Sequence, residues 1–383
     1  MIESPLTAAA PSTDLPVQRP WKGRVFEAFA IGGATVVLFP LAWLLRSKLG
    51  KEPALDVVDF GAYYLSFVIN NPHFTVTYLL FYKGFWGKVA NRDLPNSLRA
   101  RYVFAGVIAP LFLAAWAAGA LVRSSGQTLG YLIELMFLLV GWHYVKQGFG
   151  ILTVLSLRRG FRLSLWERRA VLFHCFSAWA FAWSNPSGPS KLQFEKGVFY
   201  FSIMGPPLLE KATAVVLALS TLTALGMFVR RSIRDKALPP LSPLLSFFIT
   251  LWLWTIFSSL DPVMMYLIPA LHSLQYLYVV GLYKRNQARS LEGPPHFGKP
   301  ALQKVTVLVL AATALAWFLF YALPKALDST FPSVQGSLLD TVTLGKTPFF
   351  AAIFVFINLH HYFMDNVIWR RDNPETRYLF HVS

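Results

Sequence analysis

The sequence predicts an all-α integral membrane protein, a bundle of about ten transmembrane helices. Hydrophobic residues make up 55% of the 383 residues, charged residues only 14%, and the mean hydropathy is +0.47. Soluble domains of this size rarely have such a composition. Apolar runs of about 20 residues, the length that crosses a hydrocarbon core of about 30 Å, recur along the chain. Because no stretch between them could form a separate soluble domain, we expect residues 21–383 to be a single polytopic transmembrane domain.

Ten apolar segments are candidates for membrane spans. They are residues 26–45, 57–82, 103–122, 128–157, 168–184, 210–229, 241–260, 262–283, 301–322 and 347–369. Pro72 should kink the second span and free backbone carbonyls beside His73. The fourth span is long enough to be tilted or broken. Two clusters of proline and glycine within residues 185–209 predict a loop with a short interfacial helix.

Two further features constrain the organisation of the chain. Residues 1–20 are rich in Pro, Ser, Thr and Ala and lack the apolar core and cleavage site of a signal peptide. They therefore predict a disordered cytoplasmic tail. Cys175 is the single cysteine of the sequence, which excludes an internal disulfide and any metal cluster built on cysteines.

The basic residues indicate the orientation in the membrane. The net charge of +16 comes from Lys and Arg in short clusters between the apolar runs, which favours contact with anionic lipid headgroups over nucleic acid. Alternate connections hold 25 basic residues on one side and 9 on the other, and Lys146, within a span, completes the 35. Because basic residues concentrate on the cytoplasmic side, we expect both termini in the cytoplasm, in a membrane such as a bacterial inner membrane.

Five of the eight histidines fall at one depth. Counted at about 1.5 Å per residue from the basic residue at the cytoplasmic end of each span, they lie about 13 to 23 Å into the membrane. They are His73, His143, His272, His360 and His361, from four different spans. His174 lies near the interface, and His296 and His381 fall in a polar loop and the C-terminal tail. An ionisable side chain at hydrocarbon depth is costly unless it is paired or solvated, so the layer of five predicts a functional site.

Helix geometry gives two of these histidines a polar neighbour. Gln147 follows His143 by four residues and Gln275 follows His272 by three. Both spacings place the two side chains on one face of a helix.

The last span carries its own polar face. Asn358, His361 and Asp365 follow one another at helical spacing and form one continuous face. His360 is turned by about 100° from His361. One of the two adjacent histidines can therefore act as a ligand while the other supports the site from behind.

We interpret the layer as a metal site. Neutral imidazole is a common ligand of iron, copper and zinc, and an acidic or amide neighbour typically orients the ring through its second nitrogen. The expected ligands are His73, His143, His272 and one or both of His360 and His361. Iron is the expected metal, with copper and zinc as alternatives.

The polar neighbours have expected roles as well. The residues expected to orient the ligands are Asn358, Gln147 and Gln275. Asp365 is either a further orienting residue or an oxygen ligand, because a mixed set of histidines and a carboxylate suits non-haem iron. Lys146 is either paired with Glu134 or Asp365, or it is a counter-charge for an anionic substrate or headgroup. Lys146 and Asp365 are the candidate catalytic residues.

The depth of the layer predicts a membrane metalloenzyme, an iron-dependent oxidase or oxygenase. Its substrate would be lipophilic, such as an acyl chain, a polyene or an isoprenoid, held by apolar walls that exclude water. Such a reaction also calls for an electron donor. In its layout of single histidines on separate helices that converge inside the bilayer, the chain resembles the bacterial carotene-cleaving membrane dioxygenases, although it shares no motif with them.

Three other interpretations stay open at this point. The histidines could serve only as hydrogen-bonding groups that hold the bundle together. The layer could relay protons in a proton-coupled transporter or permease. Two facing histidines could be axial ligands in a b-type haem or quinone electron-transfer protein. The sequence holds no Walker A loop, HExxH, GxSxG or CxxCH motif that would indicate another activity.

Overall fold

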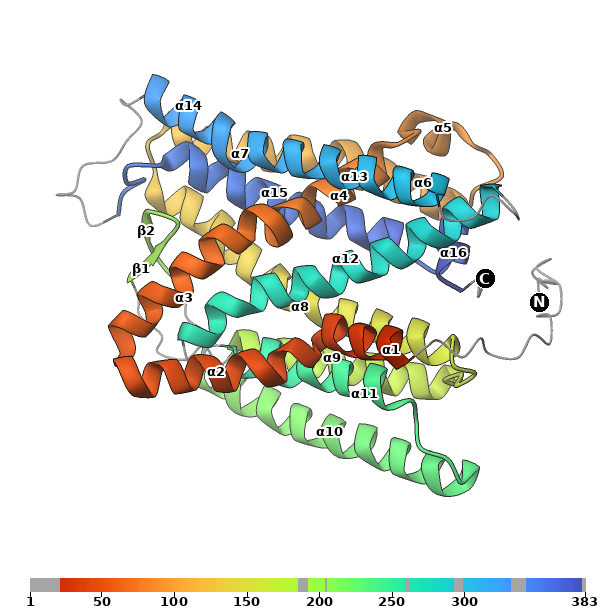
Figure 1. Ribbon diagram of the computed structural model, residues 1–383. Coiled ribbons are helices and arrows are strands. Elements are labelled where there is room, and N and C mark those ends of the chain that lie inside the picture. Colours follow the sequence, from red (N-terminus) through yellow and green to blue (C-terminus); the bar gives the residue numbers. More distant parts are fainter. Residues whose placement is uncertain are drawn as a thin grey trace.

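The computed structural model describes residues 21–184, 192–203, 205–258, 262–292, 299–331 and 342–380, and these residues are almost wholly helical (Figure 1). The predicted N-terminal tail, residues 1–20, lies outside the described residues, as do His296 and His381. Apart from residues at their ends, the described parts of all ten predicted segments lie in helical stretches. The helical fold class is therefore confirmed.

The first part of the chain forms nine α-helices with three short π-helical turns. In order they are α1 (Trp21–Ala28), η1 (Phe29–Gly33), α2 (Ala34–Leu49), α3 (Lys51–Leu65), η2 (Ser66–Asn70), α4 (Asn71–Tyr82), α5 (Phe85–Ala90), α6 (Asn96–Val103), η3 (Phe104–Ile108), α7 (Ala109–Val122), α8 (Gly126–Leu157) and α9 (Leu165–Ser184). The sequence leaves open whether the fourth span is tilted or broken, and α8 is one continuous helix of 32 residues. At about 1.5 Å per residue it extends about 48 Å.

The second part of the chain begins with a β-hairpin and continues with helices. In order the elements are β1 (Leu192–Glu195), β2 (Val198–Phe201), α10 (Pro207–Asp235), α11 (Leu241–Phe248), η4 (Ile249–Ile256), α12 (Pro262–Glu292), α13 (Lys299–Trp317), η5 (Phe318–Ala322), α14 (Leu323–Thr330), α15 (Pro348–Ile368), η7 (Pro374–Thr376) and α16 (Arg377–Phe380). The helices α4, α8, α12 and α15 run in the same direction through the molecule (Figure 1).

Five helical stretches of the described chain are long and apolar enough to cross a membrane. They are Gly23–Leu49, Asn96–Val122, Gly126–Leu157, Pro207–Asp235 and Leu302–Thr330. The helix α15 is not among them, because Asn358, His360, His361 and Asp365 interrupt its apolar sequence. Several long apolar helices of this kind are compatible with an integral membrane protein.

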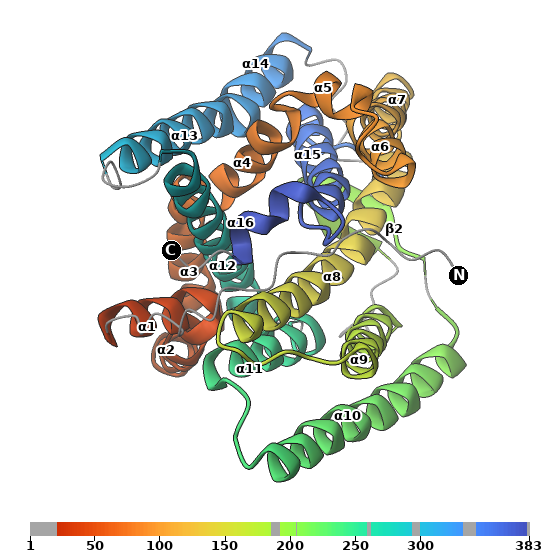
Figure 2. The ribbon, with the colours of Figure 1, turned by 90° about the vertical axis from the view of Figure 1, so that its right-hand side faces the viewer.

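Viewed along the bundle, α4, α8, α12 and α15 surround the centre (Figure 2). Peripheral helices cover them: α13 packs on α4 and α12, α7 packs on α8 and α15, and α10 lies outermost against α9. Large apolar side chains on the peripheral helices point outward, for example Leu111, Leu222 and Leu310, which are 66%, 67% and 64% exposed. An apolar exterior of this extent is typical of a surface that contacts lipid or another protein.

The hairpin corrects one expectation from the sequence. A short interfacial helix was expected within residues 185–209, but residues 192–201 form two antiparallel strands. The turn between them has Lys196 at φ 52° and Gly197 at φ 85°, and two consecutive positive φ angles define the type I′ turn that favours a two-residue hairpin. The strand β2 is fixed by a hydrogen bond from Phe199 N to Thr343 O and packs on the first turns of α8.

The contact of the hairpin with α8 depends on Gly130. A Cβ atom added at Gly130 would lie 2.3 Å from Cβ and Cγ of buried Tyr200, whereas a Cβ atom at Gly150 in the same helix meets nothing within 4 Å. We expect Gly130→Ala to lower the free energy of unfolding by about 1–3 kcal/mol through overpacking. The matched variant Gly150→Ala should leave it unchanged or raise it by up to about 1 kcal/mol. Thermal unfolding in detergent measures both, and equal effects of the two variants would contradict the packing.

Candidate metal centre

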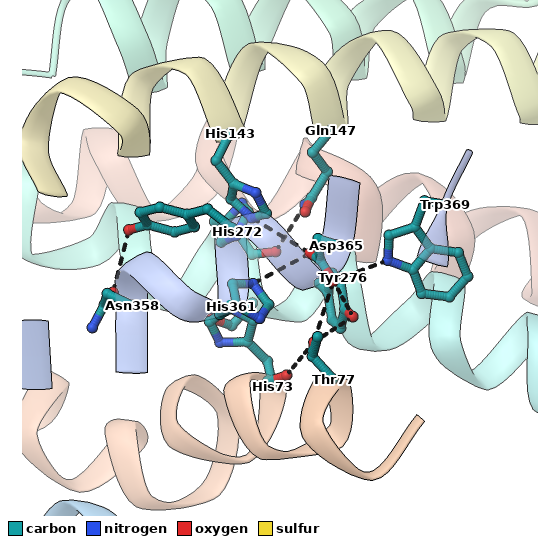
Figure 3. A network of polar contacts seen from close by, with 12 residues as sticks. His73, Thr77, His143, Gln147, His272, Tyr276, Asn358, His361, Asp365 and Trp369 are labelled. Carbon is teal, nitrogen blue, oxygen red and sulfur yellow. Dashed lines mark hydrogen bonds and ion pairs between the residues drawn. The ribbon is translucent and has the colours of Figure 1, made fainter. Parts of the chain in front are cut away.

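Four helices bring one imidazole each to the middle of the bundle. His73 lies on α4, His143 on α8, His272 on α12 and His361 on α15 (Figure 3). The ring centroid of His73 lies 4.8 Å from that of His361 and 5.4 Å from that of His272. The ring centroid of His143 lies 5.0 Å from that of His272 and 5.0 Å from that of His361. Each imidazole therefore has two of the other three as neighbours, although the residues lie up to 288 positions apart in the sequence.

These separations suit four imidazoles around one ion. A Zn–N bond of about 2.0–2.1 Å, typical of first-row metals, puts the centroid of a ligand ring about 3.2 Å from the metal. Neighbouring ligands at square or tetrahedral angles then have centroids about 4.5–5.2 Å apart. The four observed separations, 4.8 to 5.4 Å, fall within or just above this range.

The same four side chains carry ring nitrogens without a hydrogen-bond partner. The buried Nε2 atoms of His73, His143, His272 and His361 all lack one, and so do the Nδ1 atoms of His272 and His361. Buried polar atoms in folded proteins are nearly always hydrogen-bonded, and each exception needs an explanation. A group that accepts several lone pairs at once, such as a metal ion, would satisfy these nitrogens together.

One oxygen of Asp365 is fixed by three donors. Its Oδ1 atom accepts hydrogen bonds from Tyr276 Oη at 2.9 Å, Trp369 Nε1 at 3.2 Å and Thr77 Oγ1 at 3.3 Å (Figure 3). Tyr276 and Thr77 also share a hydrogen bond of 2.6 Å. The carboxylate is therefore held in one orientation from three helices.

The other oxygen of Asp365 faces the imidazoles. Its Oδ2 atom is buried without a hydrogen bond and lies 3.3 Å from His361 Nε2 and 3.8 Å from His143 Nε2. The ligand atoms of Asp365, His143 and His361 all lie within 4.8 Å of one another. This arrangement supports the expectation that Asp365 is an oxygen ligand.

His73 is held in a defined tautomer. Its Nδ1 atom lies 2.5 Å from Asn70 O and 2.8 Å from Ser273 Oγ. Because a carbonyl oxygen only accepts, Nδ1 carries the proton, and Nε2 keeps its lone pair for the cluster. The π-helical turn η2 ends at Asn70, just before Pro72. The carbonyl beside the His73 ring is thus that of the last residue of this turn.

The two glutamines form hydrogen bonds with backbone carbonyls and with other side chains, and not with the histidine rings. Gln147 Nε2 donates to the carbonyl of His272 at 3.2 Å and to Gln275 Oε1 at 2.6 Å. Gln275 Nε2 in turn donates to the carbonyl of Ile31 at 2.6 Å and to Ser246 Oγ at 3.0 Å. The pair therefore ties α8 and α12 to η1 and α11 beside the histidines.

Asn358 acts on the cluster through a tyrosine. Its Oδ1 atom accepts a hydrogen bond of 3.3 Å from Tyr362 Oη, and its Nδ2 atom donates to the carbonyl of Phe354. The ring of Tyr362 stacks on that of His143, with centroids 4.8 Å apart and an interplanar angle of 29°. Asn358 thereby positions an aromatic wall of the site.

The structure does not bring His360 to the cluster. Its Nδ1 atom is 2.9 Å from Tyr78 Oη, and its Nε2 atom is 2.9 Å from the carbonyl of Ala105 and 3.5 Å from Tyr82 Oη. Both ring nitrogens are therefore engaged by groups of α4 and η3. Of the two adjacent histidines, His361 is the one placed to bind a metal.

Lys146 forms no hydrogen bond or ion pair with the cluster among the described residues. It is half-buried on α8 and interacts electrostatically with Cys175 and Arg370. Neither Glu134 nor Asp365, the two partners considered from the sequence, forms an ion pair with it in the described part of the chain. Its role as a counter-charge is considered below.

Sequence reasoning did not assign a role at the site to the three donors to Asp365 or to the stacking tyrosine, and it favoured packing for Tyr276 and Tyr362. Thr77, Tyr276 and Trp369 each follow His73, His272 or Asp365 by four residues. Side chains four residues apart lie on one helix face. A search one helical turn beyond each candidate ligand would have found all three donors.

Comparisons with protein-family models, with curated proteins and with solved structures gave no match to this chain. The fold and the site therefore define its class by themselves. That class is a helical protein with long apolar helices and a buried cluster of four histidines and one aspartate.

The glutamine network should contribute to stability. Gln275→Leu removes the donor to Ile31 O and Ser246 Oγ and takes from the Gln147 amide its 2.6 Å acceptor, so that this amide keeps only the longer hydrogen bond to the carbonyl of His272. Because an unsatisfied buried polar group costs about 1–3 kcal/mol, we expect the free energy of unfolding to fall by at least that amount. Gln303→Leu, at an exposed position on α13, is the matched control and should change it little. Denaturation in mixed micelles measures both, and a Gln275→Leu variant as stable as the parent protein would disprove this role.

Proposed function

We propose that this chain is an integral membrane metalloenzyme in which five side chains hold one metal ion. The proposed ligands are His73, His143, His272, His361 and Asp365. The observation that carries the proposal is the set of buried, unpartnered atoms of these side chains, namely four Nε2 atoms and Asp365 Oδ2. Ligand atoms of His143, His361 and Asp365 lie within 4.8 Å of one another. His73 and His272 lie next to this group, with ring centroids 4.8 Å from His361 and 5.0 Å from His143, respectively. Left without an ion, these atoms would be an unusual concentration of unsatisfied polar groups in one place.

Iron is the metal that the donor set favours. Imidazoles combined with a carboxylate suit non-haem iron, whereas copper and zinc share the preference for imidazole. When bound, such an iron would supply oxygen activation, and we propose that the protein is an iron-dependent oxidase or oxygenase. An electron donor would be a further partner.

The side chains around the ligands have assignable tasks. Thr77, Tyr276 and Trp369 orient Asp365 so that one oxygen faces the imidazoles. Asn70 fixes the proton of His73 on Nδ1. Orienting contacts of this kind keep ligands in the correct tautomer and position, and they raise metal affinity.

The surroundings of the cluster support a lipophilic substrate. The four ligand histidines are between 0% and 5% exposed, and apolar clusters flank the site, with Met364 and Val367 on one side and Val355 and Leu359 on the other. Such walls hold an acyl chain, a polyene or an isoprenoid against the site and exclude water.

The proposed ion fits the spacing of the rings better than the alternatives do. A haem between axial imidazoles needs room for the macrocycle, but each of the four rings lies next to two others at 4.8 to 5.4 Å. A proton relay needs titratable groups that continue toward both faces. From the cluster toward the N-terminal ends of its helices, the next turn carries Ile268 and Ile357, both 2% exposed.

The proposal includes a topology. The chain would cross a bacterial-type inner membrane ten times, with both termini in the cytoplasm. In this topology α4, α8, α12 and α15 are parallel, and their C-terminal ends point toward the cytoplasm. The outward-facing leucines of α7, α10 and α13 support contact with lipid. The excess of basic residues on one side supports the orientation.

The metal content of purified protein tests the centre directly. The parent protein should hold about one ion per chain, because the proposed site has a single point of convergence. Alanine substitutions of His73, His143, His272 or His361 should each remove most of the metal, since every one of them deletes a ligand. Elemental analysis after purification from iron-supplemented cells provides the measurement.

Two buried histidines serve as controls for this experiment. His174 is 0% exposed on α9 and pairs with Ser220 Oγ, and His360 is hydrogen-bonded through both nitrogens. His174→Ala and His360→Ala should retain the metal. A parent protein that neither contains nor binds iron, copper or zinc would refute the metalloenzyme proposal.

The orientation of Asp365 can be tested by removing one hydroxyl group that donates to it. Tyr276→Phe removes a 2.9 Å hydrogen bond to Oδ1 and keeps the ring. Loss of an orienting contact typically costs about 10–100-fold in metal affinity, so we expect a decrease in that range in a chelator competition assay. Tyr283→Phe, about two turns further along α12 and away from the cluster, should bind metal like the parent protein. Unchanged affinity of Tyr276→Phe would show that Asp365 is not a ligand.

The topology predicts the accessibility of two loops. A cysteine introduced at Arg123, between α7 and α8, should react with a membrane-impermeant maleimide on intact cells or spheroplasts. A cysteine at Ala237, between α10 and α11, should react only after permeabilisation. The native Cys175 is buried and gives little background. The reverse labelling pattern would invert the orientation, and equal labelling of both sites on intact cells would contradict a membrane-spanning bundle.

A further inference from the structure

A groove lies on the far side of α15 from the histidine cluster. It has a volume of about 310 Å³ and is bordered by residues of α6, η3, α8, α9 and α15, among them Phe104, Trp142, Trp179 and Phe363. These side chains are aromatic, and Phe104 is 46% exposed. We call this feature the aromatic groove.

The aromatic groove is separate from the proposed metal centre. Phe363 is two residues from both His361 and Asp365, which places it about 160° around the helix from each of them. Asn366, which also borders the groove, is turned by about 100° from Asp365. The groove therefore occupies the outer side of the contact between α8 and α15, and the cluster occupies the inner side.

One end of the aromatic groove is cationic. Arg101 borders it directly. Lys146 lies one turn beyond Trp142 on α8, and it interacts electrostatically with Cys175 and Arg370. Cys175 precedes Trp179 by four residues on α9, and Arg370 follows Asn366 by four residues, just after the end of α15. Because Arg370 is paired with Asp372, which also interacts with Arg101, Lys146 lies toward the same end of the groove as Arg101.

One carboxylate serves these cations in the described part of the protein. Arg370 is paired with Asp372 at 2.8 Å, and Asp372 also interacts electrostatically with Arg101. Among the described residues, neither Arg101 nor Lys146 forms an ion pair with a carboxylate within 4.0 Å. A half-buried ammonium group beside an apolar groove is costly unless an anion accompanies it.

We propose that the aromatic groove binds a single-chain amphiphile with an anionic head, with the chain between Phe104, Trp142, Trp179 and Phe363 and the carboxylate or phosphate head at Arg101 and Lys146. The volume is at the low end of the range of about 300–1,000 Å³ for small-molecule sites, which favours one chain over a two-chain lipid. Arginine and lysine are the usual partners of carboxylate and phosphate groups. This site is independent of the metal centre.

Photo-crosslinking and binding assays test the proposal with purified full-length protein in a neutral detergent. The probes are palmitate, hexadecyl phosphate and hexadecanol, each with a diazirine in the chain for mapping by mass spectrometry. Both anionic probes should label residues that border the aromatic groove and compete with each other. The neutral alcohol should bind about 25-fold more weakly, because each cation near a membrane surface is worth about a fivefold change in affinity for an anion.

Separate variants change the positive charge at the end of the aromatic groove and the volume of the groove. Lys146→Gln and Arg101→Gln should each weaken palmitate binding about fivefold and leave hexadecanol binding unchanged, whereas Leu139→Trp, which fills the groove, should weaken all three probes. Arg230→Gln, at an exposed position of α10, is the matched control and should change nothing. Size-exclusion profiles and melting temperatures identify any variant that fails to fold.

Two outcomes would overturn the proposal. One is labelling that falls outside the groove, or equal binding of palmitate and hexadecanol. The other is competition by a two-chain anionic phospholipid such as phosphatidylglycerol at the same concentration as palmitate, which would identify the occupant as a bilayer lipid. Loss of metal from the histidine variants would leave the palmitate result unchanged, so failure of either proposal is recognised separately.

Discussion

The centre of the molecule depends on the carboxylate of Asp365. This group lies between side chains that donate hydrogen bonds to it and imidazoles whose nitrogens have no hydrogen-bond partner. Its Oδ1 atom accepts from Thr77, Tyr276 and Trp369, and its Oδ2 atom faces His143 and His361 without a hydrogen bond. A buried carboxylate is stable only when its lone pairs are satisfied. Three donors satisfy one oxygen, and the proposed cation would satisfy the other together with the imidazoles. The packing of α4, α12 and α15 around this group is thus coupled to what the imidazoles bind.

Part of this centre could be predicted from the sequence, for a physical reason. Helix rise is constant, so the distance of His73, His143, His272 and His361 from a basic residue gives their depth without knowledge of the fold. Depth does not give direction around the helix. The choice between His360 and His361 depended on how α15 is rotated against its neighbours, and His360 is hydrogen-bonded to Tyr78 of α4 and to the carbonyl of Ala105 in η3.

Other features of the fold depend on contacts that a single sequence does not display. The glutamines share helix faces with histidines as predicted, yet Gln147 binds the carbonyl of His272 and Gln275 binds the carbonyl of Ile31. Both contacts exist only once α8, α12 and η1 have packed together. Proline and glycine in residues 185–209 indicate a loop. The hairpin there is held in place by a hydrogen bond from Phe199 N to the carbonyl of Thr343, more than 140 residues later in the chain. The number of spans beyond the five most apolar helices is similarly undetermined by hydropathy, since polar site residues reduce the apolar character of the helices that carry them.

The parallel course of α4, α8, α12 and α15 gives the plane of imidazoles two unlike sides. Four residues after the ligand histidines stand Thr77, Gln147, Tyr276 and Asp365, and four residues before them stand Ile69, Leu139, Ile268 and Ile357. Asn70 and Asn358 are the polar residues among those three or four positions before a ligand histidine. Four helices of mixed direction would have mixed the two characters. Hydroxyl, amide and carboxyl groups therefore border the cluster on one side, whereas the mainly aliphatic other side favours contact with apolar groups.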